Sequence, residues 1–377
     1  MPRVLTVYYK HKPGGFCRRL RFKIEAFLDK GWEVHYIAIE PFPYTHLNLK
    51  PHILPTPMSN HDSILFWIYF FTTLPGFLIW VGVKNKINLI TTGSPLYAFF
   101  CGPAKWLLRV PMMTLILSKP NSHSESKSIT KALFSLEYYI ERLGLIWSNI
   151  SLANSWGSGE AWKAMHTEAG STIKILPNHI DAPPFDKSFK RKQILDEFFL
   201  DSRSFIITNT GLLQKLKNLD ILIKAIARIN DKKVVLLLIG EGKEKESLKE
   251  LAESAGVGDQ VIFTGWRTDA RELVQGSDLF VFPSLREGMA ESLLEATTCQ
   301  LPCMVSSIPE NIDVIQNPEQ HFPSDCPKIL TEKIDRLIND KDYYQNLCDS
   351  TNEDKKRFVF DWSKKFMEFV EELMKKN

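Results

Sequence analysis

The sequence predicts an α/β protein built from two doubly wound, Rossmann-like domains that face a cleft. Its 377 residues are too many for one ordinary core and suit two domains of about 150 to 200 residues each. Short apolar runs typical of buried strands alternate with helical patterns. The alternation restarts after a proline-rich polar stretch, residues 177–184, as expected for a connector between domains.

The composition is that of a globular protein, with 44% hydrophobic and 24% charged residues, which excludes wholesale disorder. The net charge of +3 conceals an asymmetry. Residues 1–150 hold 17 Lys and Arg against 8 Asp and Glu, net +9, whereas the remainder holds 30 against 36, net −6. The basic first half indicates an anionic partner, either a membrane surface or a charged substrate.

The cysteines indicate a cytoplasmic protein. The six of them form no C-x-x-C pair and no plausible disulfide ladder, so we interpret them as reduced thiols. Cys299 and Cys303 have no histidine nearby, which argues against a zinc site. The apolar run at the N-terminus is too short for a signal peptide and is typical of a first strand.

The first domain opens with the strand, glycine loop, helix and strand of a Rossmann-like half. In order these are Val4–Tyr8, a loop with Gly14 and Gly15, a helix over 18–30, and Glu33–Ile39. Gly15 permits close approach of the backbone to a ligand at the carboxyl end of the first strand. The helix carries four cations, Arg18, Arg19, Arg21 and Lys23. They form either a solvated face or a patch for an acceptor or lipid headgroup.

The segment Ser63–Val83 contains no charged residue. Its 21 residues meet the threshold of about 20 for a membrane-spanning helix. However, Pro75-Gly76 interrupts it, and the strand-helix alternation continues on both sides. We expect a helix buried partly in the domain and partly in the membrane interface. A wholly buried core helix and a true span are the alternatives.

The alternation continues to the end of the chain. Further strands are expected in the first domain at Asn88–Thr92, Met112–Leu117, Ile150–Ala153 and Ile173–Leu176. In the second domain they are expected at Phe205–Asn209, Val234–Ile239, Val261–Thr264, Leu279–Phe282 and Cys303–Ser306. A last helix, near Trp362–Lys376, carries Phe366, Phe369, Val370 and Leu373 on one face, so it must pack on another element.

The stretch Asp278–Ala296 predicts a buried strand, a tight turn and a helix. Glu287 lies in the turn, and Glu295 follows eight residues later, about two helical turns along. The backbone N–H groups of Gly288, Met289 and Ala290, near the helix start, attract an anion. Two hydroxyl acceptors beside a phosphate cradle suit a nucleotide-sugar. The alternative is an ordinary strand-turn-helix with solvated glutamates.

Three neighbouring glycine turns favour the nucleotide-sugar interpretation. Gly211, Gly240 and Gly265 each follow a predicted strand of the second domain. Carboxyl ends of parallel strands meet at one edge of a sheet, where ligands bind. Lys217 lies at the bend after the first of these strands, so its ammonium can point toward the helix start at Gly288.

With these residues the sequence resembles the GT-B retaining glycosyltransferases whose hallmark is Glu-x7-Glu, glycosyltransferase family 4, group 1. Coverage is best over residues 176–315. The matching elements are Gly14-Gly15, Leu176 to Asp181, Gly211 with Lys217, Ile239 to Gly242, Val261 to Gly265, Pro283 to Ala296, and Phe360-Asp361-Trp362.

The resemblance implies an acceptor-binding domain at 1–178, a nucleotide-sugar-binding domain at 179–354 and a final segment, 355–377, whose helix packs back on the first domain. The donor is a UDP- or GDP-linked sugar, bound as substrate, and no cofactor is implied. The acceptor is a glycan or a lipid-linked glycan. The implied enzyme is a metal-independent, hexosyltransferase-type enzyme of surface polysaccharide or lipopolysaccharide-type biosynthesis.

The resemblance also assigns roles. Lys217 neutralises the donor diphosphate, Glu287 hydrogen-bonds the sugar near the reacting carbon, and Glu295 binds the ribose. The N–H groups of Gly288, Met289 and Ala290 hold phosphate. Gly211 and Gly240 form donor-binding turns, and Gly15 lets the first-domain loop close over the donor. No metal is needed if Lys217 and the helix dipole supply the positive charge, so no metal ligand is expected. Asp340-Lys341-Asp342 sits at a polar helix end, and we interpret it as structural.

Four positions depart from the family pattern. Leu212 stands where the family has an arginine, which removes one diphosphate partner, and Lys215 is a candidate replacement. The first-domain histidine has no clear match, since Ser118 stands near its place and His123 is only a candidate. Gln300 and Glu310 replace glycines.

The alternatives are a non-hydrolysing sugar-nucleotide epimerase and a non-catalytic binding subunit. The expected location is cytoplasmic and peripheral on the membrane, with a membrane surface as partner. No nucleic-acid-binding module is recognisable.

Overall fold

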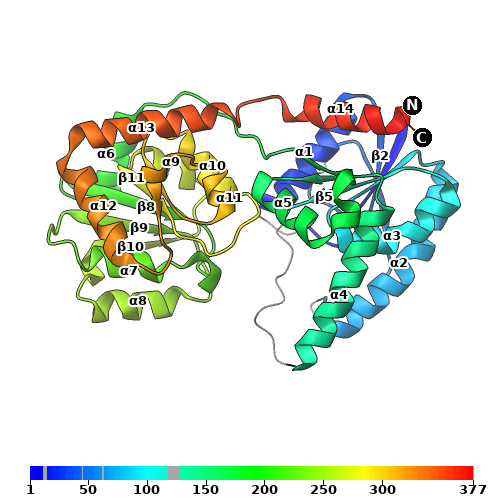
Figure 1. The fold of residues 1–377 in the computed structure, drawn as a ribbon, viewed down its shortest axis with the longest axis horizontal. Coiled ribbons are helices and arrows are strands. Elements are labelled where there is room, and N and C mark those ends of the chain that lie inside the picture. Colours follow the sequence, from blue (N-terminus) through cyan, green and yellow to red (C-terminus); the bar gives the residue numbers. More distant parts are fainter. Residues whose placement is uncertain (12–14, 45, 62, 118–127, 377) are drawn as a thin grey trace. The chain divides into compact units, whose positions relative to one another are not determined.

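The computed structural model describes residues 1–11, 15–44, 46–61, 63–117 and 128–376. The chain divides into two compact units (Figure 1). Unit 1 holds residues 1–177 and 361–377, and unit 2 holds residues 178–360. Each unit has a parallel sheet flanked by helices. The predicted pair of doubly wound domains is therefore confirmed.

The described sheet of unit 1 has seven parallel strands in the order β3-β2-β1-β4-β5-β6-β7. Helices cover both faces of such a sheet, so its strands are continuous apolar runs, and every residue of β4 and β5 is buried. The strands are β1 Arg3–Val7, β2 Glu33–Ala38, β3 Leu49–Ile53, β4 Leu89–Thr92, β5 Met112–Ile116, β6 Ile150–Ala153 and β7 Ile173–Ile175.

Strand β3 does not follow from the apolar pattern. It reads Leu-Lys-Pro-His-Ile and is exposed or half-exposed throughout. It lies at the edge of the sheet and pairs only with β2 among the described strands. An edge position tolerates Pro51, which has no N–H to donate, and a strand with one free side needs no apolar run.

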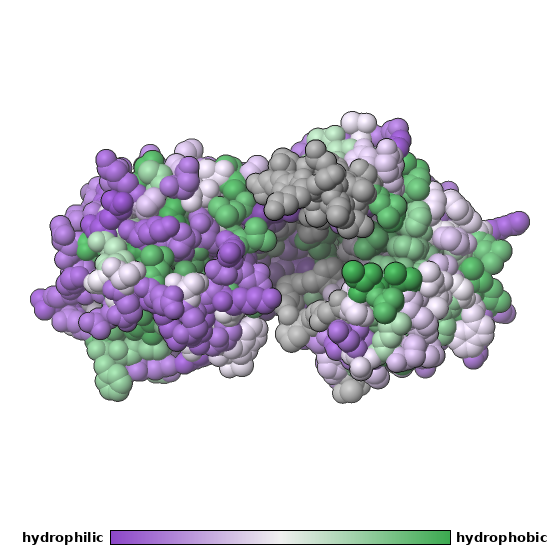
Figure 2. Space-filling view, turned by 90° about the horizontal axis from the view of Figure 1, so that it is seen from below, coloured by the Kyte–Doolittle hydropathy of each residue, from purple (hydrophilic) through white to green (hydrophobic). Residues whose placement is uncertain are grey.

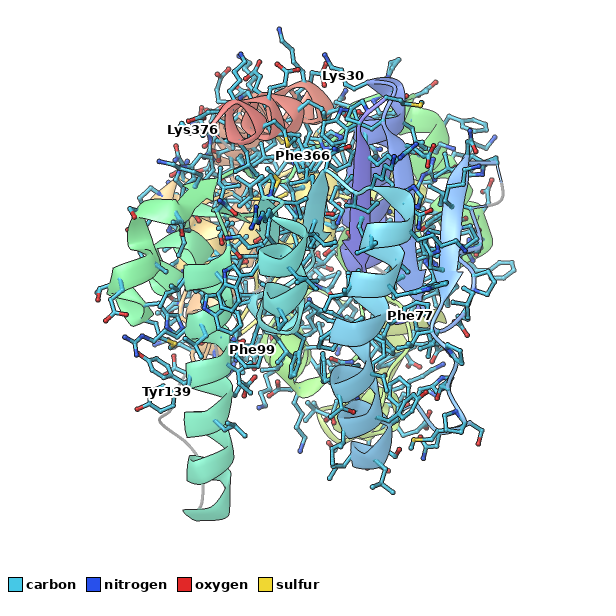
Figure 3. All side chains as sticks on the ribbon, turned by 90° about the vertical axis from the view of Figure 1, so that its right-hand side faces the viewer. Lys30, Phe77, Phe99, Tyr139, Phe366 and Lys376 are labelled. Atoms are coloured by element: carbon cyan, nitrogen blue, oxygen red, sulfur yellow. The ribbon has the colours of Figure 1, made fainter. Side chains whose placement is uncertain are left out.

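The helices of unit 1 pack on both sides of this sheet. Figure 3 shows α2, α3 and α4 side by side, with α3 in the middle. The bounds are α1 Gly15–Asp29, α2 Ile64–Asn85, α3 Pro95–Leu108, α4 Ser128–Trp147, α5 Trp156–Met165, the 3-10 turn η2 Thr167–Thr172, and α14 Trp362–Lys375.

The last helix, α14, packs on α1. The rings of Phe27 and Phe366 meet edge to face with centroids 5.4 Å apart, and both side chains are buried. The predicted return of the final helix to the first domain is therefore confirmed.

Two of the four cations on α1 contradict both interpretations of that helix. Lys23 and Arg19 are buried, with 1% and 3% of their surfaces exposed. The Lys23 ammonium donates to Thr6 Oγ1 at 2.6 Å and Thr91 Oγ1 at 3.1 Å, beneath β1 and β4. Lys23 thus belongs to the packing between α1 and the sheet, and neither a solvated face nor a headgroup patch describes these two buried side chains.

Helix α2 runs through Pro75 without a break, so the predicted interruption is wrong. Phe66, Phe70, Leu74 and Leu78 on its inner side are fully buried, and this packing holds the helix together across the proline. Among the described residues α2 is the one helix long and apolar enough to cross a membrane. Its inner side is packed into the core, and this argues against a span.

Unit 2 has six described parallel strands in the order β10-β9-β8-β11-β12-β13. They are β8 Phe205–Thr210, β9 Val234–Ile239, β10 Val261–Gly265, β11 Leu279–Phe282, β12 Cys303–Ser306 and β13 His321–Phe322. Its helices are α6 Lys187–Glu197, α7 Asp220–Ile226, α8 Lys245–Ser254, α9 Ala270–Gln275, α10 Glu291–Thr297, α11 Pro309–Ile312, α12 Pro327–Asn339 and α13 Lys341–Lys356, with 3-10 turns η3 Lys215–Lys217, η4 Gly258–Gln260 and η5 Pro318–Gln320. Asp340 caps α13 by accepting the Tyr343 N–H at 2.9 Å, a structural role as expected.

The buried Lys23 predicts a pH-dependent stability. Burial lowers its pKa to about 7, because desolvation disfavours the charged form. An unfolded lysine keeps its proton to about pH 10.4. Between these values the unfolded state binds more protons, so this residue makes stability rise with pH. We expect Lys23→Met to raise the urea midpoint most near pH 7 and progressively less toward pH 10.

The matched control is Lys30→Met, at an exposed lysine just after α1. Its midpoint should differ from that of the wild type by the same small amount at every pH. Parallel pH profiles for wild type and Lys23→Met would show that Lys23 stays charged in the folded protein.

Candidate functional site

The candidate site lies at the carboxyl edge of the sheet in unit 2, where three backbone turns are stacked. Gly211 N donates to Ile239 O at 3.0 Å, and Gly240 N donates to Gly265 O at 2.9 Å. These bonds join the turns that follow β8, β9 and β10. The predicted convergence of the glycine turns at one edge is therefore present.

Glycine is required at position 240. Its φ is +144°, and a Cβ there would lie 1.9 Å from the backbone oxygen of Gly211. No side chain fits such an approach, so Gly240 allows the turns after β8 and β9 to touch. At Gly211, where φ is +149°, a Cβ would lie 3.9 Å from Lys217 Cε. The Lys217 side chain thus passes over the first glycine turn.

Lys217 and Glu287 form the ion pair at the centre of the site. Lys217 Nζ lies 2.5 Å from Glu287 Oε1, and the two side chains are 23% and 13% exposed. The ammonium also lies 5.0 Å from the centroid of the Phe282 ring. A partly buried charge pair of this kind is stronger than a surface pair, because less water screens it.

Two anchors bring this pair together. Leu285 N donates to Leu216 O at 2.9 Å, which ties the loop after β11 to the turn η3. Asn218 ends η3 with φ +54°, and its Nδ2 donates to Ser324 O at 2.8 Å. Lys217, between these two anchors, is therefore held toward Glu287. The sequence predicts that the Lys217 ammonium points toward Gly288. In the structure it pairs with Glu287, the residue before Gly288.

The turn from Gly288 to Ala290 leads into α10 and precedes its first helical residue. Met289 and Ala290 are buried in the core beneath the turn. The helix begins at Glu291, and Ala290 at its N-cap provides no side-chain hydrogen bond. Ala290 has no polar side-chain atom to cap the helix, and backbone N–H groups at a helix start can donate to an anion. Glu295 lies half-buried in the second turn of this helix.

Asn178 holds this turn from behind, a role that the sequence does not reveal. Its buried Nδ2 donates to Met289 O at 3.2 Å and to Glu291 Oε1 at 3.0 Å. The next residues are anchored as well, since Ile180 N donates to Phe358 O at 3.0 Å. The sequence offers two signals, a polar residue at the end of an apolar run and the match of Leu176 to Asp181 to the family pattern, but neither identifies the partners of Asn178.

A second buried network supports the loop after β11. Ser306 Oγ donates to Ser284 O at 2.5 Å, and Asn311 Nδ2 donates to Ser306 Oγ at 2.9 Å. All three residues are buried. The loop that carries Glu287 is thus fixed from β12 and α11.

The other site residues lie elsewhere or outside the described parts. Gly15 opens α1 in unit 1, whereas Gly14, Ser118 and His123 lie outside the described residues. Lys215 is exposed and lines a cavity of about 430 Å³ beside α7 and α8. No cluster of three His, Cys, Asp or Glu side chains suited to a metal occurs in the described part of the chain.

The structure describes the environment of two positions that depart from the family pattern. Leu212 is 50% exposed, and an apolar side chain there gives the diphosphate no charged partner. Gln300 has φ +55°, a left-handed conformation in which glycine is the unstrained residue.

Substitution of Gly240 tests the close approach of the turns. Gly240→Ala should lower the free energy of unfolding by about 3 kcal/mol or more, because a backbone clash adds to the positive φ. Gly256→Ala is the control, since φ there is +70° and no atom lies within 4 Å of the added Cβ. It should cost about 1–2 kcal/mol. Equal urea midpoints for the two variants would contradict the clash.

The second half of the chain is similar to known proteins. Residues 190–355 match the family model for Glycosyl transferases group 1. A UDP-Gal:alpha-D-GlcNAc-diphosphoundecaprenol alpha-1,3-galactosyltransferase of Escherichia coli is 31% identical over 44% of this chain and 43% of its own length. An N-acetyl-alpha-D-glucosaminyl L-malate synthase of Bacillus anthracis is 28% identical over 48% of each chain. The chain thus aligns with less than half the length of these relatives.

Solved structures match the whole fold. HepE of Anabaena in complex with UDP has a TM-score of 0.78 at 15% identity, covering 99% of this chain and 100% of that one. Sucrose-phosphate synthase of Thermosynechococcus elongatus has a TM-score of 0.79 at 18% identity, covering 100% of both chains. The chain therefore has the GT-B fold, and its residues 190–355 match the family model for Glycosyl transferases group 1.

Proposed function

We propose that the protein is a retaining, metal-independent glycosyltransferase. It moves a hexosyl group from a UDP- or GDP-sugar to a glycan or lipid-linked acceptor in surface polysaccharide or lipopolysaccharide-type biosynthesis. It works in the cytoplasm, peripherally on a membrane. The observation that carries the proposal is the Lys217–Glu287 ion pair above the stacked glycine turns.

The comparisons support the substrate classes. The relative from Escherichia coli is named for transfer of galactose from UDP to a diphosphoundecaprenol-linked sugar. The Anabaena structure contains UDP. A nucleoside diphosphate needs a cation, backbone N–H groups and a carboxylate for the ribose. Lys217, the start of α10 and Glu295 would supply these in unit 2.

Donor binding would exchange one ion pair for another. Lys217 would leave Glu287 for the diphosphate, and Glu287 would then accept hydrogen bonds from the hydroxyls of the sugar. The bond between the anomeric carbon and the diphosphate oxygen breaks, and the acceptor oxygen bonds to that carbon on the same face. The acceptor's proton passes to the departing diphosphate. Catalysis would rest on positioning and on stabilising charge at the leaving group.

Substitution of Lys217 tests the proposal. With a radiolabelled UDP- or GDP-hexose and an acceptor, Lys217→Ala should lower kcat/KM by about 10²–10³, because one charge on the departing diphosphate goes uncompensated. Lys224→Ala is the control. It removes a lysine of similar pairing, 2.6 Å from Asp220, on an exposed part of α7, and should leave kcat/KM within about twofold.

Three results would overturn the proposal. One is an absence of both transfer and donor hydrolysis with every common UDP- and GDP-hexose. Interconversion of free nucleotide-sugars without an acceptor would make the protein an epimerase. Nucleotide binding without any turnover would make it a binding subunit.

Asn178 predicts a separate effect on the donor. Asn178→Asp places a carboxylate against Glu291 and the Met289 carbonyl, so the turn at 288–290 should shift. Donor KM should rise by about tenfold or more, as expected for the loss of hydrogen bonds to a charged partner. Adding Glu291→Gln should restore part of this loss, because the new amide can donate to the introduced carboxylate. An unchanged donor KM in Asn178→Asp would show that the turn does not depend on Asn178.

A further inference from the structure

The outer side of α2, α3 and α4 is apolar, and many of its large hydrophobic side chains are exposed among the described residues. Of the 22 large hydrophobic residues that are exposed in the described part of the chain, 11 lie on these three helices. The helices comprise 56 residues. Figure 2 shows hydrophobic residues gathered on the surface of unit 1. We call this outer side the apolar face.

On α2 the exposed residues follow a single stripe. Leu65 and Ile68 are 68% and 57% exposed near its start, and Trp80 and Val83 are exposed near its end. Thr72 and Gly76 continue the stripe between them. The opposite side of the helix fills the core, so folding of unit 1 does not require this stripe to be apolar.

Helix α4 repeats the pattern. Leu136, Tyr139, Leu143 and Ile146 are exposed and recur at intervals of three and four residues, which places them on one side of a helix. Figure 3 shows Tyr139 pointing away from the neighbouring helices. At the end of α3, between the other two, Trp106 and Leu107 are exposed as well. Scattered exposed hydrophobic residues are normal, but aligned stripes on adjacent helices mark a binding surface.

The direction of the helices places part of this face at one edge of the sheet. Helices α2 and α4 lead into β4 and β6, which run parallel to β1. A crossover helix in a parallel sheet runs back against the strands. The first turns of α2 and α4 therefore lie at the carboxyl edge, and Ile64 and Leu65 in the first turn of α2 are exposed there.

Charge distinguishes a lipid surface from a protein partner. No Asp or Glu occurs between Asp62 and Glu125. The exposed cations Lys84, Lys86 and Arg109 lie just at or beyond the ends of α2 and α3. Lys84 Nζ lies 4.9 Å from the centroid of the Trp80 ring. Tryptophan beside lysine is typical of segments at a bilayer surface, where anionic headgroups attract the cation.

A second copy of the chain fits this surface less well. In a symmetric dimer the same surface meets itself. Helices α2 and α3 carry no carboxylate that could pair with the cations at their ends across such an interface, and the two carboxylates of α4, Glu137 and Glu141, are half-buried.

We propose that the apolar face binds the surface of a bilayer that contains anionic lipids. The outer stripe of α2 lies in the interfacial region, and the inner side of the helix stays packed on the sheet, so the helix does not span. This inference deepens the proposed function by naming the membrane-contacting residues. A lipid-linked acceptor would then reach unit 1 at the carboxyl edge of its sheet.

Vesicle co-sedimentation tests the inference. The wild-type chain should bind vesicles of phosphatidylcholine with phosphatidylglycerol, and bind less at high salt or to phosphatidylcholine alone. The double variant Leu65→Glu, Ile68→Glu should bind at least about tenfold more weakly, since two apolar side chains no longer enter the interface. Phe199→Glu is the control. It adds the same type of charge at a hydrophobic residue of unit 2 that is 95% exposed, and binding should not change.

A second variant separates charge from apolar contact. Lys84→Glu with Lys86→Glu should remove the preference for phosphatidylglycerol and leave the weaker binding to phosphatidylcholine. Equal urea midpoints for all variants would show that they fold. The inference is overturned if the wild type binds no vesicles. It is also overturned if the wild type is a dimer in solution that Leu65→Glu, Ile68→Glu dissociates, because a second copy then covers the face.

Activity provides an independent readout. If the proposed function holds, the double variant should transfer sugar to a soluble, lipid-free glycan at the wild-type rate. Vesicle binding by a wild-type chain that transfers no sugar would overturn the proposed function and support the apolar face. Transfer by a wild-type chain that binds no vesicles would do the reverse.

Discussion

The contact between the backbone turns at Gly211 and Gly240 is the constraint on which unit 2 depends. Because a Cβ at 240 would meet the Gly211 oxygen at 1.9 Å, only glycine lets the ends of β8 and β9 close together. That closure fixes where η3 begins, and η3 carries Lys217 over Gly211 to Glu287. Backbone geometry thus brings Lys217 and Glu287 together, and electrostatic attraction then stabilises the pair.

The sequence predicts those features of the fold that local patterns of residues control. Both parallel sheets, the glycine turns and the return of α14 follow from apolar runs, strand-end glycines and the apolar side of one helix. The hydrogen-bond partners of buried polar groups cannot be predicted from these patterns. Lys23 reads as a surface cation because helical spacing alone cannot show that it points between Thr6 and Thr91. The sequence around Asn178 is typical of a linker, and the partners of Asn178 lie more than 100 residues away. Strand β3 is not predicted because an edge strand needs no apolar run.

Helix α2 combines the composition of a membrane span with the packing of a core helix. Its length and hydropathy fit a membrane span, yet Phe66, Phe70, Leu74 and Leu78 are as buried as any core residue. A helix that is apolar all round cannot reveal from sequence which side faces protein. In the structure the sheet covers one side of α2. The other side can contact a medium that is less polar than water, such as the bilayer interface.

Asn178 has a consequence for how the chain can be recombined. It is the first residue of unit 2, directly after Pro177, yet its side chain belongs to the turn before α10. A chimera that joins unit 1 of one relative to unit 2 of another must therefore cut ahead of position 178, so that this asparagine travels with the turn it supports. Junctions placed a few residues later would pair a foreign linker with the native turn and lose the hydrogen bonds that shape it.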